Sequence, residues 1–102
     1  MAQSRFKQRT VLITGAGTGM GRAAALRLAE EEAHLVLVGR RPEPLERLVS
    51  DIEAASGTAM AITCDISRGD AVAAAVEKTI ARFGRLDALF ANAGVLGEFK
   101  PL

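Results

Sequence analysis

Four short apolar runs along the chain predict β-strands. They cover residues 11–14, 35–38, 59–63 and 88–91. Each run is continuously apolar rather than alternating with polar residues, which is the pattern of strands covered on both faces, as in a parallel sheet.

Between these runs the apolar residues change to helical spacing. Residues 22–32 form an alanine-rich stretch after the first run. The next stripe follows the i, i+3, i+4, i+7 spacing of one helix face and consists of Leu45, Leu48, Val49 and Ile52. Pro42 and Pro44 suit the entry of this helix, and Gly57 suits its end.

A further helical stripe consists of Val72, Val76, Ile80 and Phe83. Gly84 is expected to close this helix, and Ser67 with Asp70 resembles a capping box at its start. The order βαβαβαβ follows, and parallel strands joined by helices predict a doubly wound α/β sheet of the Rossmann-like class.

Composition narrows the class of protein. The 102 residues suffice for one small domain, and 49% are hydrophobic, which permits a packed core. Thirteen Lys and Arg against 12 Asp and Glu give no case for nucleic-acid or membrane binding, and no apolar stretch reaches the ~18 residues of a membrane helix. A single cysteine and a first segment without an apolar signal region predict a cytoplasmic protein.

A glycine-rich turn lies between the first predicted strand and the first helix. Its glycines are spaced G-x-x-x-G-x-G at Gly15, Gly19 and Gly21, with Gly17 in addition. Such a turn lets the backbone approach a phosphate closely, and the helix that follows offers free N–H groups and a positive dipole end. The alternative is a turn of the same composition that binds nothing.

The end of the second predicted strand reads Gly39-Arg40-Arg41. A fold that binds NAD usually places an acid about 20 residues past the glycines, to hold the ribose 2′-hydroxyl. Here the acid is missing, and guanidinium groups form bidentate bonds to phosphate, so we favour recognition of a 2′-phosphate, mainly by Arg40. The alternative is that both arginines are solvated turn residues.

Polar residues also follow the third and fourth predicted strands. Asp65 would lie on the carboxyl edge of the sheet, where its carboxylate can accept a bond from an adenine amino group, or it is a turn residue. Asn92 either touches a cofactor ribose or belongs to an ordinary turn. His34, at the opposite edge, is expected to be a surface residue and Cys64 a core residue, and no Cys/His cluster has metal-ligand spacing.

Three motifs together resemble the short-chain dehydrogenase/reductase family. They are the turn TGAGTGMG at residues 14–21, the tripeptide Cys64-Asp65-Ile66 and the tripeptide Asn92-Ala93-Gly94. The motifs occur in the order of the family and span nearly the whole chain. Met20 stands where isoleucine is common, and Ala91 where the family often has an asparagine.

The resemblance implies a strand order of 3-2-1-4 and a role for each motif. Thr14 would brace the turn, Thr18 and Arg40 would lie near the adenosine ribose, and Gly39 occupies the place that NAD-preferring members fill with Asp. This implies that NADP is preferred and NAD is less favoured. The expected cofactor-binding residues are Thr14, Gly15, Gly17, Thr18, Gly19, Met20, Gly21, Arg40, Arg41, Asp65, Ile66, Asn92, Ala93 and Gly94.

Family members reach roughly 250 residues, within the size of a single large α/β domain. Their chemistry uses a Ser and a Tyr-x-x-x-Lys arrangement, and this chain contains no tyrosine. We therefore expect residues 1–102 to be one partial domain, the cofactor-binding half of an oxidoreductase for carbonyl or alcohol substrates, inactive by itself, with no catalytic and no metal-binding residue. The fourth strand would then be an open apolar edge that favours self-association.

Two alternatives remain for the chain as a whole. The first alternative to an oxidoreductase half is a nucleotide-binding module without chemistry. The second is a nonfunctional truncated product.

Overall fold

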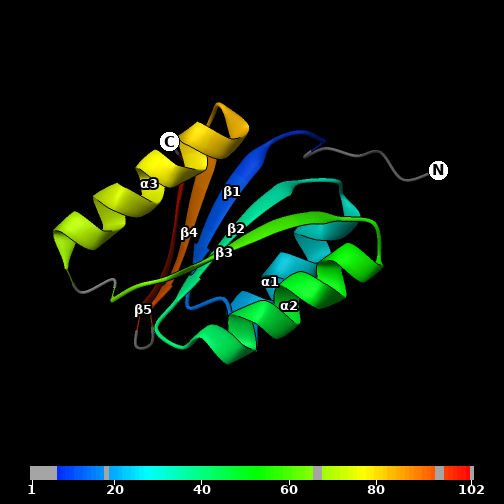
Figure 1. Cartoon of the computed structure of the whole chain (residues 1–102), viewed down its shortest axis with the longest axis horizontal. Coiled ribbons are helices and arrows are strands. Elements are labelled where there is room, and N and C mark those ends of the chain that lie inside the picture. Colours follow the sequence, from blue (N-terminus) through cyan, green and yellow to red (C-terminus); the bar gives the residue numbers. More distant parts are fainter. Residues whose placement is uncertain (1–6, 18, 66–67, 94–95, 102) are drawn as a thin grey trace.

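A computed structural model of the chain describes residues 7–17, 19–65, 68–93 and 96–101, of which 91–93 and 96–101 are described by their backbone alone. The elements alternate between strand and helix along most of the chain (Figure 1). In chain order they are β1 (Thr10–Thr14), α1 (Gly19–Glu30), β2 (His34–Gly39), α2 (Pro42–Ala54), β3 (Thr58–Thr63), α3 (Gly69–Phe83), β4 (Ala88–Ala93) and β5 (Leu96–Pro101).

The strands form one sheet in the order β3-β2-β1-β4-β5. The pairs among β1 to β4 are parallel, which confirms the Rossmann-like order 3-2-1-4. The expectation that β4 is an open edge is wrong, because β5 pairs with it in the antiparallel direction. The segment LGEFKP carries a glycine, two charged residues and a proline instead of an apolar run, so the hydrophobic pattern does not reveal it as a strand.

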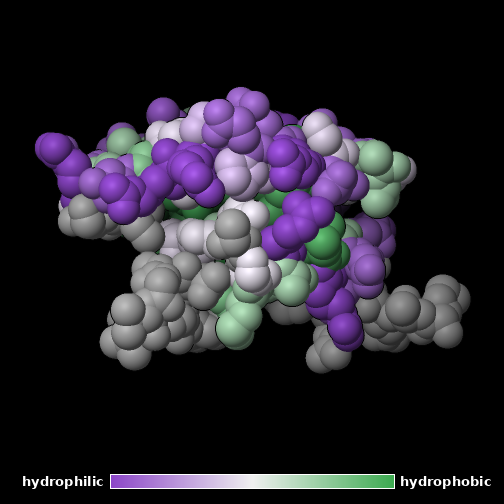
Figure 2. Space-filling model, turned by 90° about the horizontal axis from the view of Figure 1, so that it is seen from below, coloured by the Kyte–Doolittle hydropathy of each residue, from purple (hydrophilic) through white to green (hydrophobic). Residues whose placement is uncertain are grey.

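Helices cover both faces of the sheet. In Figure 1, α1 and α2 lie together on one face and α3 lies on the other. Successive residues of a strand point to opposite faces, so Val11 and Ile13 of β1 pack in the cluster under α1 and α2, whereas Leu12 packs in the cluster under α3. This two-sided burial explains the apolar runs of β1 and β2, whereas the outer strand β3 is only partly buried and leaves Ala61 exposed. Most of the coloured surface in Figure 2 is hydrophilic; green shows between the polar side chains and, paler, at the right and lower centre of the view.

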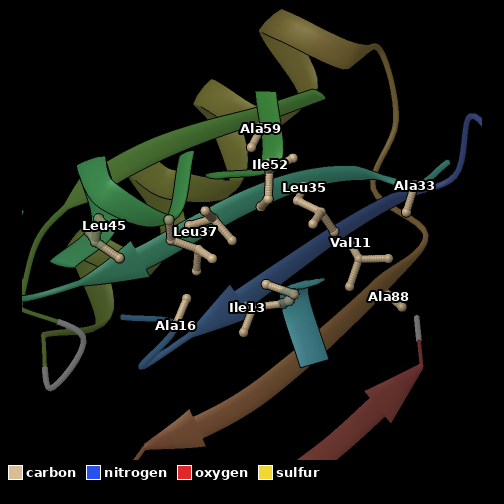
Figure 3. Packing of buried hydrophobic residues seen from close by; sticks show 12 residues of the cluster. Val11, Ile13, Ala16, Ala33, Leu35, Leu37, Leu45, Ile52, Ala59 and Ala88 are labelled. Atoms are coloured by element: carbon tan, nitrogen blue, oxygen red, sulfur yellow. The ribbon is translucent and has the colours of Figure 1, made fainter. Parts of the chain in front are cut away.

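The larger core cluster joins α2 to the central strands. Figure 3 shows Leu45 beside Leu37, and Ile52 beside Leu35. Each of these four side chains is at most 1% exposed. Burying a leucine or isoleucine side chain contributes about 1.5–3 kcal/mol, so these contacts stabilise the packing of α2 on the sheet.

The residues that helix α3 buries differ from the predicted apolar stripe. Ile80 is 48% exposed, and the side chains that α3 buries are Ala75 and Thr79. The Thr79 hydroxyl donates a hydrogen bond of 2.8 Å to the carbonyl of Ala75, which makes its burial tolerable. The helix N-cap is Arg68, which makes no side-chain capping bond, whereas Ser67 lies outside the described residues.

Gly57 has a different role at the end of α2 from the one predicted. The N–H of Ser56 donates to the carbonyl of Glu53, and the N–H of Gly57 donates to that of Ile52, which is a Schellman motif. The left-handed residue of this motif is Ser56, with φ of 69°, not Gly57. A Cβ atom at Gly57 would lie 2.6 Å from Cγ2 of Ile52, so glycine is needed there for close approach.

Candidate functional site

The carboxyl ends of the parallel strands meet along one edge of the sheet. Thr14, the last residue of β1, is paired in register with Val38 of β2 on one side and with Ala91 of β4 on the other. Gly39 is paired with Thr63 in the same way. The loops that leave β1, β2 and β3 therefore emerge side by side, as ligand-binding loops do in open α/β sheets.

Backbone hydrogen bonds hold these loops together beyond the strands. The N–H of Ala16 donates to the carbonyl of Val38 at 3.3 Å, which ties the glycine turn to the end of β2. The N–H of Cys64 donates to the carbonyl of Gly39 at 2.9 Å, which ties the end of β3 to the same place. Three of the predicted motifs are thus brought together at this edge.

The glycine turn has the backbone form that its sequence requires. Gly15 and Gly19 have φ of 63° and 54°, in the left-handed region that favours glycine. Beyond its chain neighbours and its own helix, a Cβ atom at Gly19 would meet no atom of the described residues within 4 Å, so the space at the start of α1 is open on that side. Ala16 is buried and anchors the turn in the core, whereas Thr18 lies outside the described residues.

Helix α1 begins at this turn with its N–H groups at the open edge. Its first turn carries no acidic residue, so nothing within it neutralises the positive end of the helix dipole. Met20 is 72% exposed there, which leaves an apolar side chain at the surface beside the turn. Gly21 is buried within α1, as suits a glycine that lets a helix pack closely against the sheet.

The first turn of α2 packs against both glycine positions of the site. A Cβ atom at Gly17 would lie 2.7 Å from the Cβ atom of Pro44. A Cβ atom at Gly39 would lie 3.3 Å from Cδ2 of the buried Leu45. Adjacent residues of α2 therefore contact the glycine turn and the end of β2 at once.

Arg40 and Arg41 lie between these contacts, at the start of α2. Both are exposed, and neither forms an ion pair with another residue that the structure describes. Arg41 is the N-cap of α2 in extended conformation, and Pro42 opens the helix. The acidic residue in the first turn of α2 is Glu43. Two guanidinium groups are thus available for an anion beside the glycine turn.

The remaining predicted residues lie on the same edge where the structure describes them. Asp65 is exposed after β3, and its carbonyl accepts a bond of 3.1 Å from the N–H of Arg68. Asn92 and Ala93 belong to β4, which continues past the predicted end at residue 91 and pairs them with Gly97 and Leu96 of β5. Ile66 and Gly94 lie outside the described residues.

The opposite edge of the sheet carries different chemistry. His34 opens β2 there, and its ring stacks on that of Phe83 with 4.9 Å between centroids. A hollow of about 430 Å³ at this edge is lined by polar residues that include Lys7, Glu30 and Thr58. Within the described ranges no group of three His, Cys, Asp or Glu residues is placed to hold a metal ion, and no helix is long and apolar enough to cross a membrane.

The site fits the phosphates of a nucleotide. Its open glycine turn, the acid-free helix N-terminus and the two arginines all favour bound negative charge. The sequence pointed to the turn by its glycine spacing and to the arginines by the missing acid. It placed Pro44 and Leu45 in the helix but did not reveal their contacts with Gly17 and Gly39, which arise when α2 folds back onto the sheet.

The chain matches the family model described as short chain dehydrogenase over residues 9–102. It is 44% identical to levodione reductase from Leifsonia aquatica, over 96% of this chain and 38% of that protein. The chain spans 37% or 38% of the length of some of the curated relatives that it matches and 27% of others.

Solved structures agree with this match. A metagenomic short-chain oxidoreductase in complex with NADP is 39% identical with a TM-score of 0.84, covering 88% of this chain and 41% of that one. Xylitol dehydrogenase with bound NAD+ is 37% identical with a TM-score of 0.84, covering 88% of this chain and 35% of that one. One neighbour thus holds NADP and the other NAD+.

Proposed function

The chain belongs to the short-chain dehydrogenase family, and we propose that it forms the NADP-binding part of an oxidoreductase for carbonyl or alcohol substrates. The observation that carries this proposal is that Arg40 follows the acid-free end of β2, which the bond from Ala16 to Val38 ties to the glycine turn. The neighbours bound to NADP and to NAD+ support a dinucleotide cofactor for this chain. The similarity to levodione reductase supports a carbonyl substrate class.

The proposed cofactor is held through its charged groups. The backbone of Gly15, Gly17 and Gly19 and the start of α1 would hold the pyrophosphate, with Met20 at the surface beside them. Arg40, assisted by Arg41, would pair with the 2′-phosphate. Asp65 would accept a bond from the adenine amino group, and Asn92 and Ala93 would border the cofactor.

NADP is proposed over NAD on charge. A carboxylate at the end of β2 would repel a 2′-phosphate, and this chain has Gly39 there instead. The relatives support either dinucleotide, since one neighbour is bound to NADP and another to NAD+. The proposed preference for NADP therefore rests on Arg40 and Arg41.

We propose that the 102 residues bind cofactor without turnover. A bound nicotinamide supplies the hydride in this class of chemistry. The protein must also provide a general acid for the carbonyl oxygen, and the chain contains no tyrosine for that task. Its own residues bind and orient the cofactor through the glycine turn and the arginines.

Calorimetric titration of the chain with NADP and NAD tests the binding proposal. We expect binding of NADP that is tighter than that of NAD. A folded sample that takes up neither nucleotide would contradict it. In an assay of NADPH oxidation with a panel of carbonyl compounds, turnover that a Gly19 substitution abolishes would overturn the proposed inactivity.

The second candidate is a nucleotide-binding module that takes no part in catalysis. The absence of tyrosine favours it, because the chain carries the glycine turn and the two arginines but no tyrosine to act as a general acid. A longer reading frame with Tyr-x-x-x-Lys after Leu102 would contradict it and favour the oxidoreductase. A chain that is unfolded by circular dichroism would instead support a nonfunctional truncated product.

Location and assembly remain proposals as well. The one cysteine, Cys64, cannot form an internal disulfide and supports a cytoplasmic location. Self-association through an exposed sheet edge would involve β3 or β5, because these are the outer strands.

A further inference from the structure

Pro44 contacts the glycine turn through its least adaptable atoms. The Cβ position of Gly17 would lie 2.7 Å from Cβ of Pro44 and 3.7 Å from its Cγ and its carbonyl carbon. The proline ring fixes these atoms to the backbone, so they cannot turn aside as the end of a long side chain would. The turn is therefore seated on α2 at a distance that glycine alone permits.

The same helical turn determines where the arginines lie. Arg41 is the N-cap of α2, Pro42 is its first residue and Pro44 its third. Leu45 follows Pro44 and contacts the Gly39 position from within the core, where it is 1% exposed. A shift of this turn would therefore move Arg40 and Arg41 relative to the glycine turn.

We propose that Pro44 is a positioning residue, which fixes the glycine turn at the distance from Arg40 and Arg41 that lets one ligand engage both. This inference rests on the proposed function, because its ligand is a nucleotide with a phosphate at each end of the ribose. The glycine turn would hold the 5′-phosphate, and the arginines would hold the 2′-phosphate. In this proposal Pro44 acts through the glycine turn and contacts neither phosphate.

The spacing has a measurable consequence. Two phosphates on one ribose gain affinity from the second contact only when both contacts can be made without strain. The affinity ratio of 2′,5′-ADP to 5′-AMP therefore reports the spacing, because the two ligands differ only in the 2′-phosphate. A general loss of stability would lower both affinities and leave their ratio unchanged.

Gly17→Ala is the test variant. The φ angle of Gly17 is not in the left-handed region, and the nearest atoms that an alanine Cβ would meet beyond the chain neighbours belong to Pro44. We expect the affinity ratio to fall about tenfold, because the turn must move away from α2. Gly69→Ala is the matched control, since a Cβ atom there would meet no described residue within 4 Å beyond its chain neighbours and its own helix. Its ratio should equal that of the unmodified chain.

Compensation distinguishes positioning from general damage. Adding Pro44→Gly to Gly17→Ala removes the opposing Cβ atom and should restore most of the ratio. Adding Pro44→Ala instead retains that atom and should restore none of it. Pro44→Gly alone leaves a gap and should lower the ratio, which keeps the test informative if Gly17→Ala does not fold.

Titration calorimetry on the folded chain measures all these ratios. If Gly17→Ala and Pro44→Gly each leave the ratio unchanged, the inference about Pro44 is overturned, while the proposed function stands. If the unmodified chain binds 2′,5′-ADP no better than 5′-AMP, the proposed preference for NADP fails first.

Discussion

The backbone N–H of Thr10 donates a hydrogen bond of 2.7 Å to Oδ2 of Asp87, and the N–H of Asp87 donates back to the carbonyl of Thr10 at 2.8 Å. This reciprocal pair joins the first residue of β1 to the residue just before β4. Arg85 adds a charge-assisted bond of 2.6 Å to Oδ1 of Asp87. These bonds join the amino ends of β1 and β4, at the edge of the sheet opposite the proposed ligand site.

Loss of the Asp87 charge should weaken the fold in acid. The hydrogen bond from Arg85, followed by that from Thr10, holds the pKa of Asp87 below its usual 3.8, against the opposing effect of burial. A lowered pKa gives stability that is present above 3.8 and lost as the pH falls through the pKa of the folded state. Asp87→Asn removes the charge, so its free energy of unfolding should be lower than that of the unmodified chain at pH 7.

Urea unfolding from pH 7 down to pH 2 measures this effect. The difference between the two proteins should shrink as the pH falls below 4. Asp70→Asn is the control, because its exposed pair with Arg68 should contribute little at any pH. A difference for Asp87→Asn that stays constant with pH would refute the electrostatic explanation.

The hydroxyl of Thr10 should be a net cost to stability. Thr10 is 0% exposed, and its Oγ1 has no hydrogen-bond partner among the residues that the structure describes. Valine has nearly the same shape without the buried polar atom, so Thr10→Val should raise the free energy of unfolding by about 1 kcal/mol.

Thr79→Val is the matched comparison for Thr10→Val. Its hydroxyl is equally buried but donates to the carbonyl of Ala75, so its loss should lower the free energy of unfolding by about 1 kcal/mol. Denaturant titration gives both values. Equal changes for the two variants would show that the unpaired hydroxyl of Thr10 has no particular effect.

Neighbouring residues at the end of α2 should respond to substitution in opposite directions. Ser56 adopts a left-handed conformation that costs a side-chain-bearing residue about 1–2 kcal/mol, so Ser56→Gly should stabilise the chain by about 1 kcal/mol. Gly57→Ala would drive a Cβ atom into Ile52 and should destabilise it by about 1–3 kcal/mol. Thermal unfolding measures both effects. A higher melting temperature for Gly57→Ala than for Ser56→Gly would contradict this account.

The sequence could predict whatever depends on local pattern. Continuous apolar runs identified β1 to β4, and the spacing of Gly15 and Gly19 identified the glycine turn, in which the structure gives both residues left-handed φ angles. Strand β5 was missed because its sequence contains a glycine, two charged residues and a proline, and its assignment as a strand depends on pairing with β4.

Tertiary contacts explain the other differences. Gly57 looked like a helix stop of the usual kind, yet its role depends on the position of Ile52 in the folded helix. The contact between Gly17 and Pro44 joins residues 27 positions apart, and no periodicity in the sequence reports such a distance.

Arg40 provides the most direct test of cofactor choice. Arg40→Asp replaces a guanidinium with a carboxylate beside the proposed 2′-phosphate position, so it should both remove an attraction and add a repulsion. Because a hydrogen bond to a charged group contributes about 1.5–3 kcal/mol, NADP affinity should fall by about tenfold to a hundredfold. NAD carries no 2′-phosphate and can donate its ribose hydroxyl to the new carboxylate, so NAD affinity should hold or rise.

Arg47→Asp separates this local effect from a change in net charge. Arg47 is exposed on α2 and forms no ion pair with another described residue, so the substitution changes the net charge of the chain equally. Calorimetric titration at two salt concentrations should show a small, salt-sensitive loss for Arg47→Asp and a reversal of cofactor preference for Arg40→Asp alone. If both variants lose NADP affinity to the same extent, the arginines act through overall charge and the 2′-phosphate site at Arg40 is wrong.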